Sequence, residues 1–202
     1  MIFGDEQYRL LPMVLSQFQA VGRDLFTRGL VSSHSGNISV RMGDRIIITR
    51  RGSQLGNLQE QDLVETGVFK NDRFTPLASI ELPVHRATYQ NTSALAIVHA
   101  HPPYAIALSM TEEEELVFED TEDELSELGH VPVIGHNQMN RPGQAGEVIA
   151  GALKGNHAIL VDGHGSFTGG QHLEEAYRYT AALEEKCQVL WLVKTLKRRQ
   201  AN

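Results

Sequence analysis

The segment Ala96–His101, AIVHAH, is followed directly by Pro102 and Pro103. Small and β-branched apolar residues favour a buried strand here, and two prolines prevent its continuation because proline has no N–H for the ladder. Side chains two residues apart on a strand point to the same face, with Cα atoms roughly 6.6 Å apart. His99 and His101 are therefore predicted to point in one direction from the end of a strand.

A third histidine stands in a similar context. His164 follows a predicted buried strand over residues 158–161 and lies in a glycine turn, within HAILVDGHG. Two strand ends of this kind can meet at one edge of a sheet, where α/β proteins tend to bind ligands. Three imidazoles with one open position are a common arrangement for catalytic zinc. The alternative is that each histidine is an ordinary core or turn residue, but the shared context favours a metal site.

Glu81 is the carboxylate that best completes this set. It lies in PLASIELPVH, near the start of a helix that we expect from Ser79 to Tyr89 with Ser79 as its N-cap. A glutamate at this place can simply stabilise the helix dipole. Beside a metal, it can instead be a fourth ligand or a general base.

A second candidate binding region comprises SSHSGNISVR and ITRRGSQLGNL. Gly36, Asn37 and Gly52 permit close approach of the backbone to a ligand, and loop N–H groups bind anions. Arg50 and Arg51 can add charge-assisted hydrogen bonds. Taken separately, these residues can equally be turn residues and surface charges.

The remaining pattern predicts one α/β domain over residues 1–202. A helix is expected within residues 5–30, a hairpin over 37–50, a further hairpin around 63–76, and helices over 142–155 and 172–199. Because hairpins dominate the first half, the sheet is expected to be at least partly antiparallel.

Composition restricts the partners. The net charge of −7 argues against a nucleic-acid partner, which usually requires a basic face. The single cysteine, Cys187, cannot form an intramolecular disulfide. The first residues lack the pattern of a signal peptide, and no apolar run approaches membrane-spanning length, so we expect a cytoplasmic protein without a membrane partner.

In this order, the motifs resemble the class II aldolase/adducin family, typified by L-fuculose-1-phosphate aldolase. The likeness covers nearly the whole chain. The matching stretches are GNISVR (36–41), IT with Gly52 and Leu58, S-I-E (79–81) with His85, IVHAHPPYA (97–105), GHVPVIG (129–135) and DGHGSFTGGQHLEEAYRYTAALEE (162–185).

The resemblance implies a three-layer α/β/α sandwich around a mainly antiparallel, mixed sheet. It also implies a divalent metal, usually Zn²⁺ but otherwise Mn²⁺ or Co²⁺, and a homotetramer with active sites at subunit interfaces. His99, His101 and His164 match the family's metal ligands, and Glu81 matches the carboxylate that coordinates the metal or serves as the base. Asn37, Gly52 and Ser79 match positions that hold a substrate phosphate.

The implied activity is that of a lyase, cleaving a small ketose, such as a sugar phosphate, through a metal-stabilised enediolate. Related members are epimerases, dehydratases or decarboxylases, and adducin-like modules keep the fold without the metal. Ile80 replaces a serine that is common in the aldolases, and Arg51 replaces a threonine, so Arg51 is a candidate ligand for the substrate's anionic group. The tyrosines that the aldolases use, one from a neighbouring subunit and one near the C-terminus, have no match here; Asp120 or Asp123 in the acidic segment is a candidate replacement.

Overall fold

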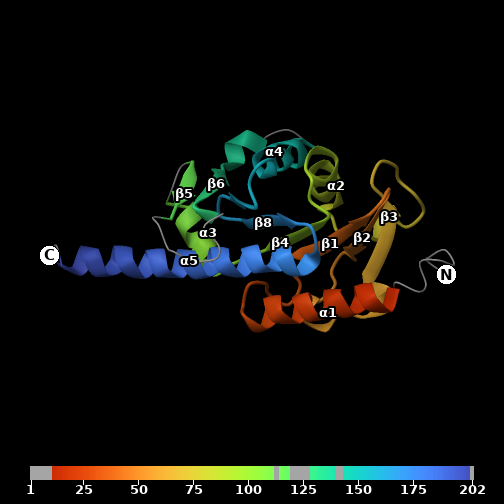
Figure 1. The fold of residues 1–202 in the computed structure, drawn as a ribbon, viewed down its shortest axis with the longest axis horizontal. Coiled ribbons are helices and arrows are strands. Elements are labelled where there is room, and N and C mark those ends of the chain that lie inside the picture. Colours follow the sequence, from red (N-terminus) through yellow and green to blue (C-terminus); the bar gives the residue numbers. More distant parts are fainter. Residues whose placement is uncertain (1–10, 112–113, 119–127, 140–142, 201–202) are drawn as a thin grey trace.

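The computed structural model describes residues 11–111, 114–118, 128–139 and 143–200. Its centre is an eight-stranded sheet with the order β3-β2-β1-β4-β8-β7-β6-β5 (Figure 1). The strands are β1 (Asn37–Met42), β2 (Arg45–Thr49), β3 (Leu63–Gly67), β4 (Ala96–Ala100), β5 (Glu115–Val117), β6 (His130–Ile134), β7 (Ala158–Val161) and β8 (Gly165–Gly170).

Neighbouring strands are antiparallel except for β6 and β7, which pair in parallel. The predicted hairpin is confirmed as β1 and β2, joined by a turn in which Gly43 has φ +59°. The further hairpin was wrong: β3 pairs with β2, but residues 75–77 form a short 3-10 helix, η4 (Thr75–Leu77), instead of a returning strand. Asp72 accepts the N–H groups of Phe74 and Thr75 through its side chain, which favours this turn over a strand.

Helices cover both faces of the sheet, in three layers (Figure 1). On one side lie α1 (Leu11–Thr27), α3 (Pro103–Ser109) and the long α5 (Leu173–Gln200). On the other side lie α2 (Leu82–Asn91) and α4 (Gln144–Leu153), packed against each other. Short 3-10 segments complete the described elements: η2 (Leu55–Asn57), η3 (Glu60–Asp62) and η6 (His136–Met139). This is the expected α/β/α sandwich.

The inner strands are buried on both faces, and their alternation divides the core. Ile46 and Ile48 of β2 pack under α2 and α4, whereas Ile47 between them packs with α1. In β7, Ile159 belongs to the α2–α4 side and Leu160 to the α3–α5 side. Strands that are apolar on both faces need helices on both sides, so this pattern requires the layered arrangement.

Helix α2 begins later than the sequence pattern predicts. Ser79 is not its N-cap; Glu81 holds that position, and the helix starts at Leu82. The reason is that the Ser79 N–H donates to the carbonyl of Thr49, which ties residues 78–79 to the sheet. This pairing places the Glu81 side chain beside the end of β4.

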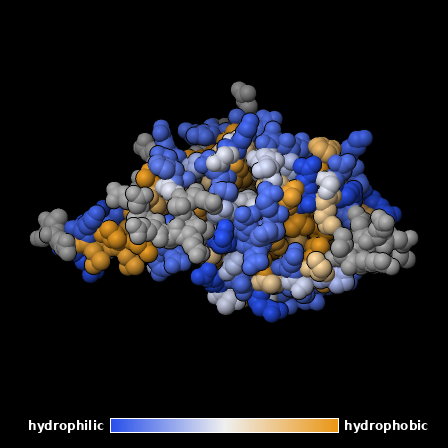
Figure 2. All heavy atoms as spheres, viewed as in Figure 1, coloured by the Kyte–Doolittle hydropathy of each residue, from blue (hydrophilic) through white to orange (hydrophobic). Residues whose placement is uncertain are grey.

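The last part of α5 extends beyond the sheet (Figure 1) and carries several exposed apolar side chains, visible as an orange group in Figure 2. The exposed large apolar side chains of this part of the helix are Val189, Trp191, Leu192, Val193 and Leu196. Among the residues that the structure describes, no helix combines the length and apolarity needed to cross a bilayer.

Candidate metal centre

His99 and His101 stand at the end of β4, as predicted, and point toward the face covered by α2. His99 shares this face with Ile97, because side chains alternate along the strand. The Nε2 atoms of His99 and His101 are 3.1 Å apart. Pro102 then turns the chain into α3.

His164 comes to the same place from the turn between β7 and β8. Its Nε2 lies 3.3 Å from the Nε2 of His99. The close approach depends on Gly165, where an added Cβ would collide with the carbonyl oxygen of Ala100. The two strand ends therefore meet at one sheet edge, as we expected.

The chain fixes which nitrogen of His99 faces this cluster. His99 Nδ1 lies 2.9 Å from the carbonyl oxygen of Ser166, so Nδ1 carries the proton and Nε2 presents its lone pair. The ring also stacks on Phe167, with centroids 4.2 Å apart. Burial lowers the pKa of His99 to about 3, and burial also lowers the pKa of His101. Both imidazoles are consequently neutral near pH 7, the form that binds metals.

Glu81 completes the cluster. Its carboxylate oxygens lie 3.4 Å from His99 Nε2 and 3.4 Å from His164 Nε2. Burial alone would raise the pKa of Glu81, but the hydrogen bond with His164 and the proximity of His99 and Asn37 outweigh it and lower the pKa to about 2. The side chain of Glu81 is 19% exposed and that of His164 is 42% exposed, whereas that of His99 is 2% exposed, so the cluster opens to solvent on one side.

These residues fit a divalent metal. The nitrogens of His99, His101 and His164 all lie within 4.8 Å of one another. Two nitrogens that each lie about 2.0–2.1 Å from a tetrahedral ion are about 3.3 Å apart, close to the separations of His99 Nε2 from the Nε2 atoms of His101 and His164. Neutral imidazoles with a neighbouring carboxylate are typical zinc ligands.

Two of the predicted substrate residues, Asn37 and Ser79, contact Glu81. Asn37 is buried, and its Nδ2 is 3.1 Å from Glu81 Oε2. Ser79 Oγ accepts the N–H of Glu81. Arg51 is exposed, and its backbone N–H donates to the carbonyl oxygen of Leu77, so the turn containing Arg51 and Gly52 lies beside the segment that leads to Glu81. Asp120 and Asp123 lie outside the described residues.

Three residues next to the centre carry no role in the sequence-based interpretation. His85, Ser39 and Tyr89 are fully buried and connected by hydrogen bonds. A signal was present: Glu81, His85 and Tyr89 are spaced four residues apart, which aligns them on one helix face. Asn37 and Ser39 similarly share one face of β1.

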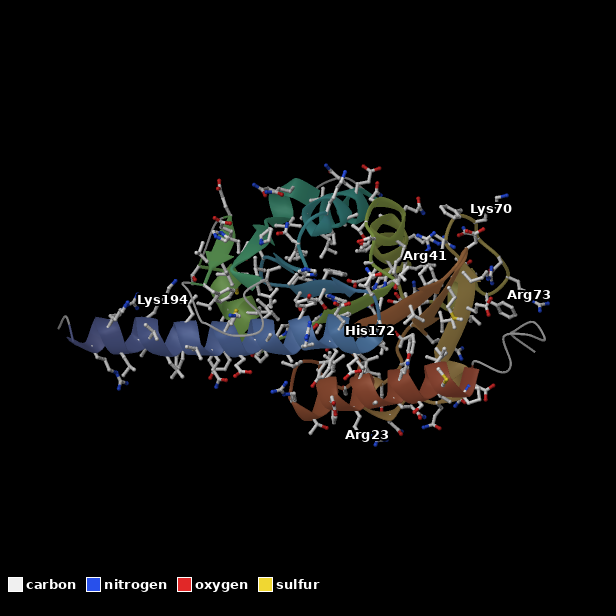
Figure 3. The ribbon with its side chains drawn as sticks, viewed as in Figure 1. Arg23, Arg41, Lys70, Arg73, His172 and Lys194 are labelled. Atoms are coloured by element: carbon white, nitrogen blue, oxygen red, sulfur yellow. The ribbon has the colours of Figure 1, made fainter. Side chains whose placement is uncertain are left out.

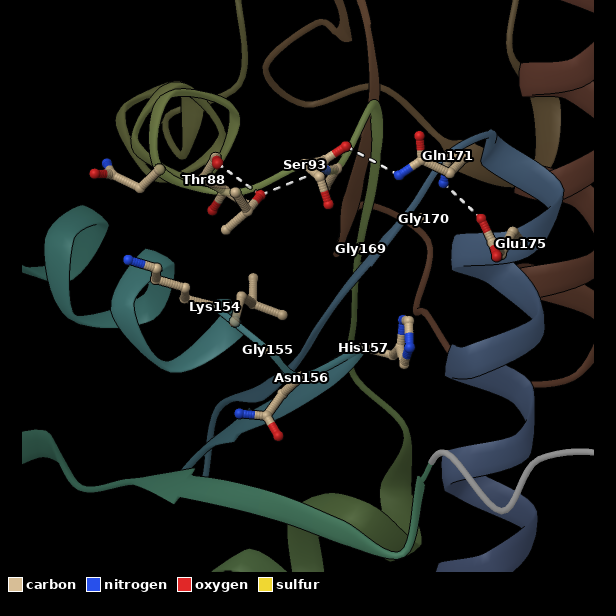
Figure 4. A pocket seen from close by; sticks show the side chains of 14 residues that line it. Thr88, Ser93, Lys154, Gly155, Asn156, His157, Gly169, Gly170, Gln171 and Glu175 are labelled. Carbon is tan, nitrogen blue, oxygen red and sulfur yellow. Dashed lines mark hydrogen bonds between the residues drawn. The ribbon is translucent and has the colours of Figure 1, made fainter.

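A separate hollow of about 380 Å³ lies at the opposite end of the same strands (Figure 4). Several of its polar groups bond to each other: Gln171 donates to the carbonyl of Ser93 through its side chain, and Glu175 accepts the N–H of Gln171. The histidine cluster is therefore a distinct site, at the other edge of the sheet.

Comparison with known proteins is consistent with this geometry. The family model described as class II aldolase and adducin N-terminal domain matches residues 16–191. The chain belongs to this family. The crystal structure of L-fuculose-1-phosphate aldolase from Thermus thermophilus superimposes with a TM-score of 0.83 at 36% identity, covering 91% of this chain and 95% of that one.

Relatives within the class II aldolase family carry different activities in their names. An L-fuculose phosphate aldolase of Methanococcus maripaludis is 29% identical over 187 residues, 92% of this chain and 100% of the relative. A probable bifunctional methylthioribose-1-phosphate isomerase/methylthioribulose-1-phosphate dehydratase of Nocardia farcinica is 30% identical over 194 residues, 87% of this chain. The chain spans only 35% of that longer protein.

Proposed function

We propose that this chain is a zinc-dependent lyase that cleaves a small ketose phosphate by a reversible aldol reaction. The observation that carries the proposal is the convergence of His99, His101 and His164 beside the Glu81 carboxylate at an open sheet edge. Membership of the class II aldolase family and the similarity to L-fuculose-1-phosphate aldolase support the reaction type.

The three histidines and Glu81 are the residues that would hold the ion. Bound there, a divalent cation supplies a Lewis acid that polarises a carbonyl oxygen and stabilises the negative charge that develops beside it, an effect of several kcal/mol. His99 is the most rigid of these ligands, because Ser166 fixes its tautomer and Phe167 packs on its ring.

Glu81 is the proposed acid–base group. Its lowered pKa keeps the carboxylate ionised at neutral pH, so it can accept a proton from the substrate carbon next to the carbonyl and return it. Its partial exposure lets a substrate reach it from the open side.

We assign the binding of the substrate's anionic group to the turn after β2 and to the segment just before α2. The turn at Arg51 and Gly52 and the segment at Ser79 are adjacent, so an anionic group of the substrate can contact an arginine, a hydroxyl and backbone N–H groups together. If Arg51 binds a phosphate, Arg51→Ala raises the KM for a phosphorylated ketose by about 10- to 100-fold, or about 1.4–2.8 kcal/mol. An exposed arginine of α1, in Arg23→Ala, is the control (Figure 3), and an unchanged KM for Arg51→Ala would rule out this role.

The test of the function is a panel of ketose phosphates, each assayed with added Zn²⁺, Mn²⁺ or Co²⁺. Release of dihydroxyacetone phosphate or glycolaldehyde phosphate, lost in Glu81→Gln by about 10²- to 10⁴-fold in kcat, supports aldol cleavage. Conversion of a ketose phosphate without carbon–carbon cleavage, or loss of water from it, would contradict cleavage and favour an epimerase or the dehydratase activity named for the Nocardia relative.

A further inference from the structure

A continuous row of buried polar side chains leads from Glu81 into the interior between β1 and α2. Asn37 Nδ2 lies 3.1 Å from Glu81 Oε2, and Asn37 Oδ1 lies 2.6 Å from His85 Nε2. His85 Nδ1 lies 2.6 Å from Ser39 Oγ, which lies 2.7 Å from the hydroxyl of Tyr89. Apart from Glu81, every member is at most 6% exposed.

The direction of each hydrogen bond follows from the carboxylate. An ionised carboxylate only accepts, so Asn37 faces it with its NH₂ group and turns its oxygen to His85. His85 must then donate from Nε2, which leaves Nδ1 of the neutral ring as an acceptor. Ser39 consequently donates to His85 and accepts from Tyr89. All four donors therefore point toward Glu81.

The surroundings keep this polarity. Burial lowers the pKa of His85 to about 4, so the ring is neutral at pH 7. Burial also raises the pKa of Tyr89 well above its usual range, so its hydroxyl keeps its proton. Arg41, labelled in Figure 3, donates to the backbone carbonyl of Tyr89 and so fastens the far end of the row to β1.

Packing requirements do not by themselves account for a buried histidine, serine and tyrosine between a strand and a helix. Each polar group costs free energy there unless it has a partner, and apolar residues of similar size would fill the same space. The row instead ends on the one carboxylate of the candidate centre and occupies an oxygen of that carboxylate.

We infer that Asn37, His85, Ser39 and Tyr89 form a positioning relay that holds the Glu81 carboxylate in a single orientation beside the three histidines. This inference rests on the proposed function for the role of Glu81. Aligned hydrogen bonds strengthen one another, and partners of this kind behind a metal site typically change activity or metal affinity about 10- to 100-fold when removed. Asn37 thereby acts on Glu81 through its side chain.

The test removes a hydroxyl that does not touch Glu81. Ser39→Ala removes the hydroxyl between His85 and Tyr89, which Asn37 and His85 separate from the Glu81 carboxylate. Tyr89→Phe removes only the last donor of the relay. Thr180→Val is the matched control, since Thr180 is a fully buried residue on α5 whose hydroxyl bonds to Thr168 and the carbonyl of Ala176. The measurements are kcat and KM on the zinc-loaded protein, the free energy of unfolding, and the visible spectrum of the Co²⁺-loaded protein.

We expect Ser39→Ala to lower kcat about tenfold with KM nearly unchanged, and Tyr89→Phe to lower it less. Ser39→Ala also shifts the Co²⁺ absorption bands, whereas Thr180→Val loses comparable stability but keeps kcat and the spectrum. In the parent protein, ¹⁵N NMR of the His85 ring should show a proton on Nε2 and none on Nδ1. A proton on Nδ1, or equal effects of Ser39→Ala and Thr180→Val, would overturn the relay.

The two proposals fail in different ways. If no ketose phosphate is cleaved by the parent protein, the proposed function fails, while the ring nitrogens of His85 and the Co²⁺ spectrum still decide the relay. If cleavage is found but Ser39→Ala leaves kcat and the spectrum as they are in the parent, the function stands and the relay fails.

Discussion

Two clusters of ionisable side chains in this protein differ in whether they contain a cation that pairs with their carboxylates. At the end of β4, nitrogens of three imidazoles and the oxygens of the Glu81 carboxylate face each other. Between β2 and β3, Arg45 lies 2.7 Å from Glu65 and 2.9 Å from Asp72, so this cluster contains its own cation.

The difference separates a structural cluster from a candidate functional one. Buried charges are stable when they are paired, and the guanidinium of Arg45 pairs with the carboxylates of Glu65 and Asp72. In the histidine centre, ring nitrogens of three imidazoles and the oxygens of Glu81 instead gather around one point, an arrangement that fits a divalent cation. His164, with its side chain 42% exposed, lies on the open side of the histidine centre.

The largest expected effect comes from removing two of the proposed metal ligands together. The double variant His99→Ala, His101→Ala should lose its zinc and lower cleavage of the preferred ketose phosphate by about 10³-fold or more, since the ion supplies several kcal/mol. Metal analysis and kcat/KM check this. His130→Ala, which removes an exposed histidine on β6, is the control and should keep both. Equal zinc content in the parent and the double variant would refute the centre.

An intermediate effect is expected at the Arg45 cluster. Glu65→Gln removes a buried charge partner of Arg45 and should lower the free energy of unfolding by about 1–3 kcal/mol, measured by urea titration. Zinc content and kcat should not change, because the cluster lies on β2 and β3, away from the histidines. Glu60→Gln, at an exposed position in η3, should cost little. A loss of zinc in Glu65→Gln would show that the two clusters are coupled.

The most gradual effect is a pH dependence of the stability of the metal-free protein. His85 and His99 have pKa values of about 4 and about 3 in the folded protein, below the ordinary 6.5. Between each of these values and pH 6.5, the unfolded chain therefore binds more protons than the folded one. Stability is therefore lost as the pH falls below 6.5, by up to about 1.4 kcal/mol per pH unit for each group. Glu81, with its lowered pKa, adds a further loss below about pH 4.5.

Urea unfolding of the protein in chelator, from pH 8 to pH 4, measures this slope. The variant His99→Ala, His101→Ala should show a smaller slope between pH 6.5 and 4, because one of the two most perturbed imidazoles is gone. A parent protein whose stability is constant over this range would show that these histidines are not buried as neutral rings.

Much of the fold was predictable because its signals are local. Prolines ended β4, a glycine turn joined β1 and β2, and helical periodicity marked α1, α4 and α5. The histidine pair was predictable for the same reason, since the period of a strand fixes where residues two apart point.

The failures arose where a distant strand competes with a local preference. Ser79 has the character of an N-cap, yet its backbone bonds to Thr49, and α2 starts only at Leu82. Glu81 therefore occupies the N-cap position, where its carboxylate also lies beside His99. No local pattern contains this pairing.

The sequence by itself determined the ligand types, the layered α/β/α class and the family, because these depend on residue identity, on period and on motif order. The tertiary structure supplied the distances at which the predicted partner His164 meets the β4 histidines, and it alone showed that Asn37, Ser39, His85 and Tyr89 align behind Glu81. Hydrogen bonds of about 3 Å between residues up to 65 positions apart depend on how strands pair and helices pack, and only the folded chain fixes those distances.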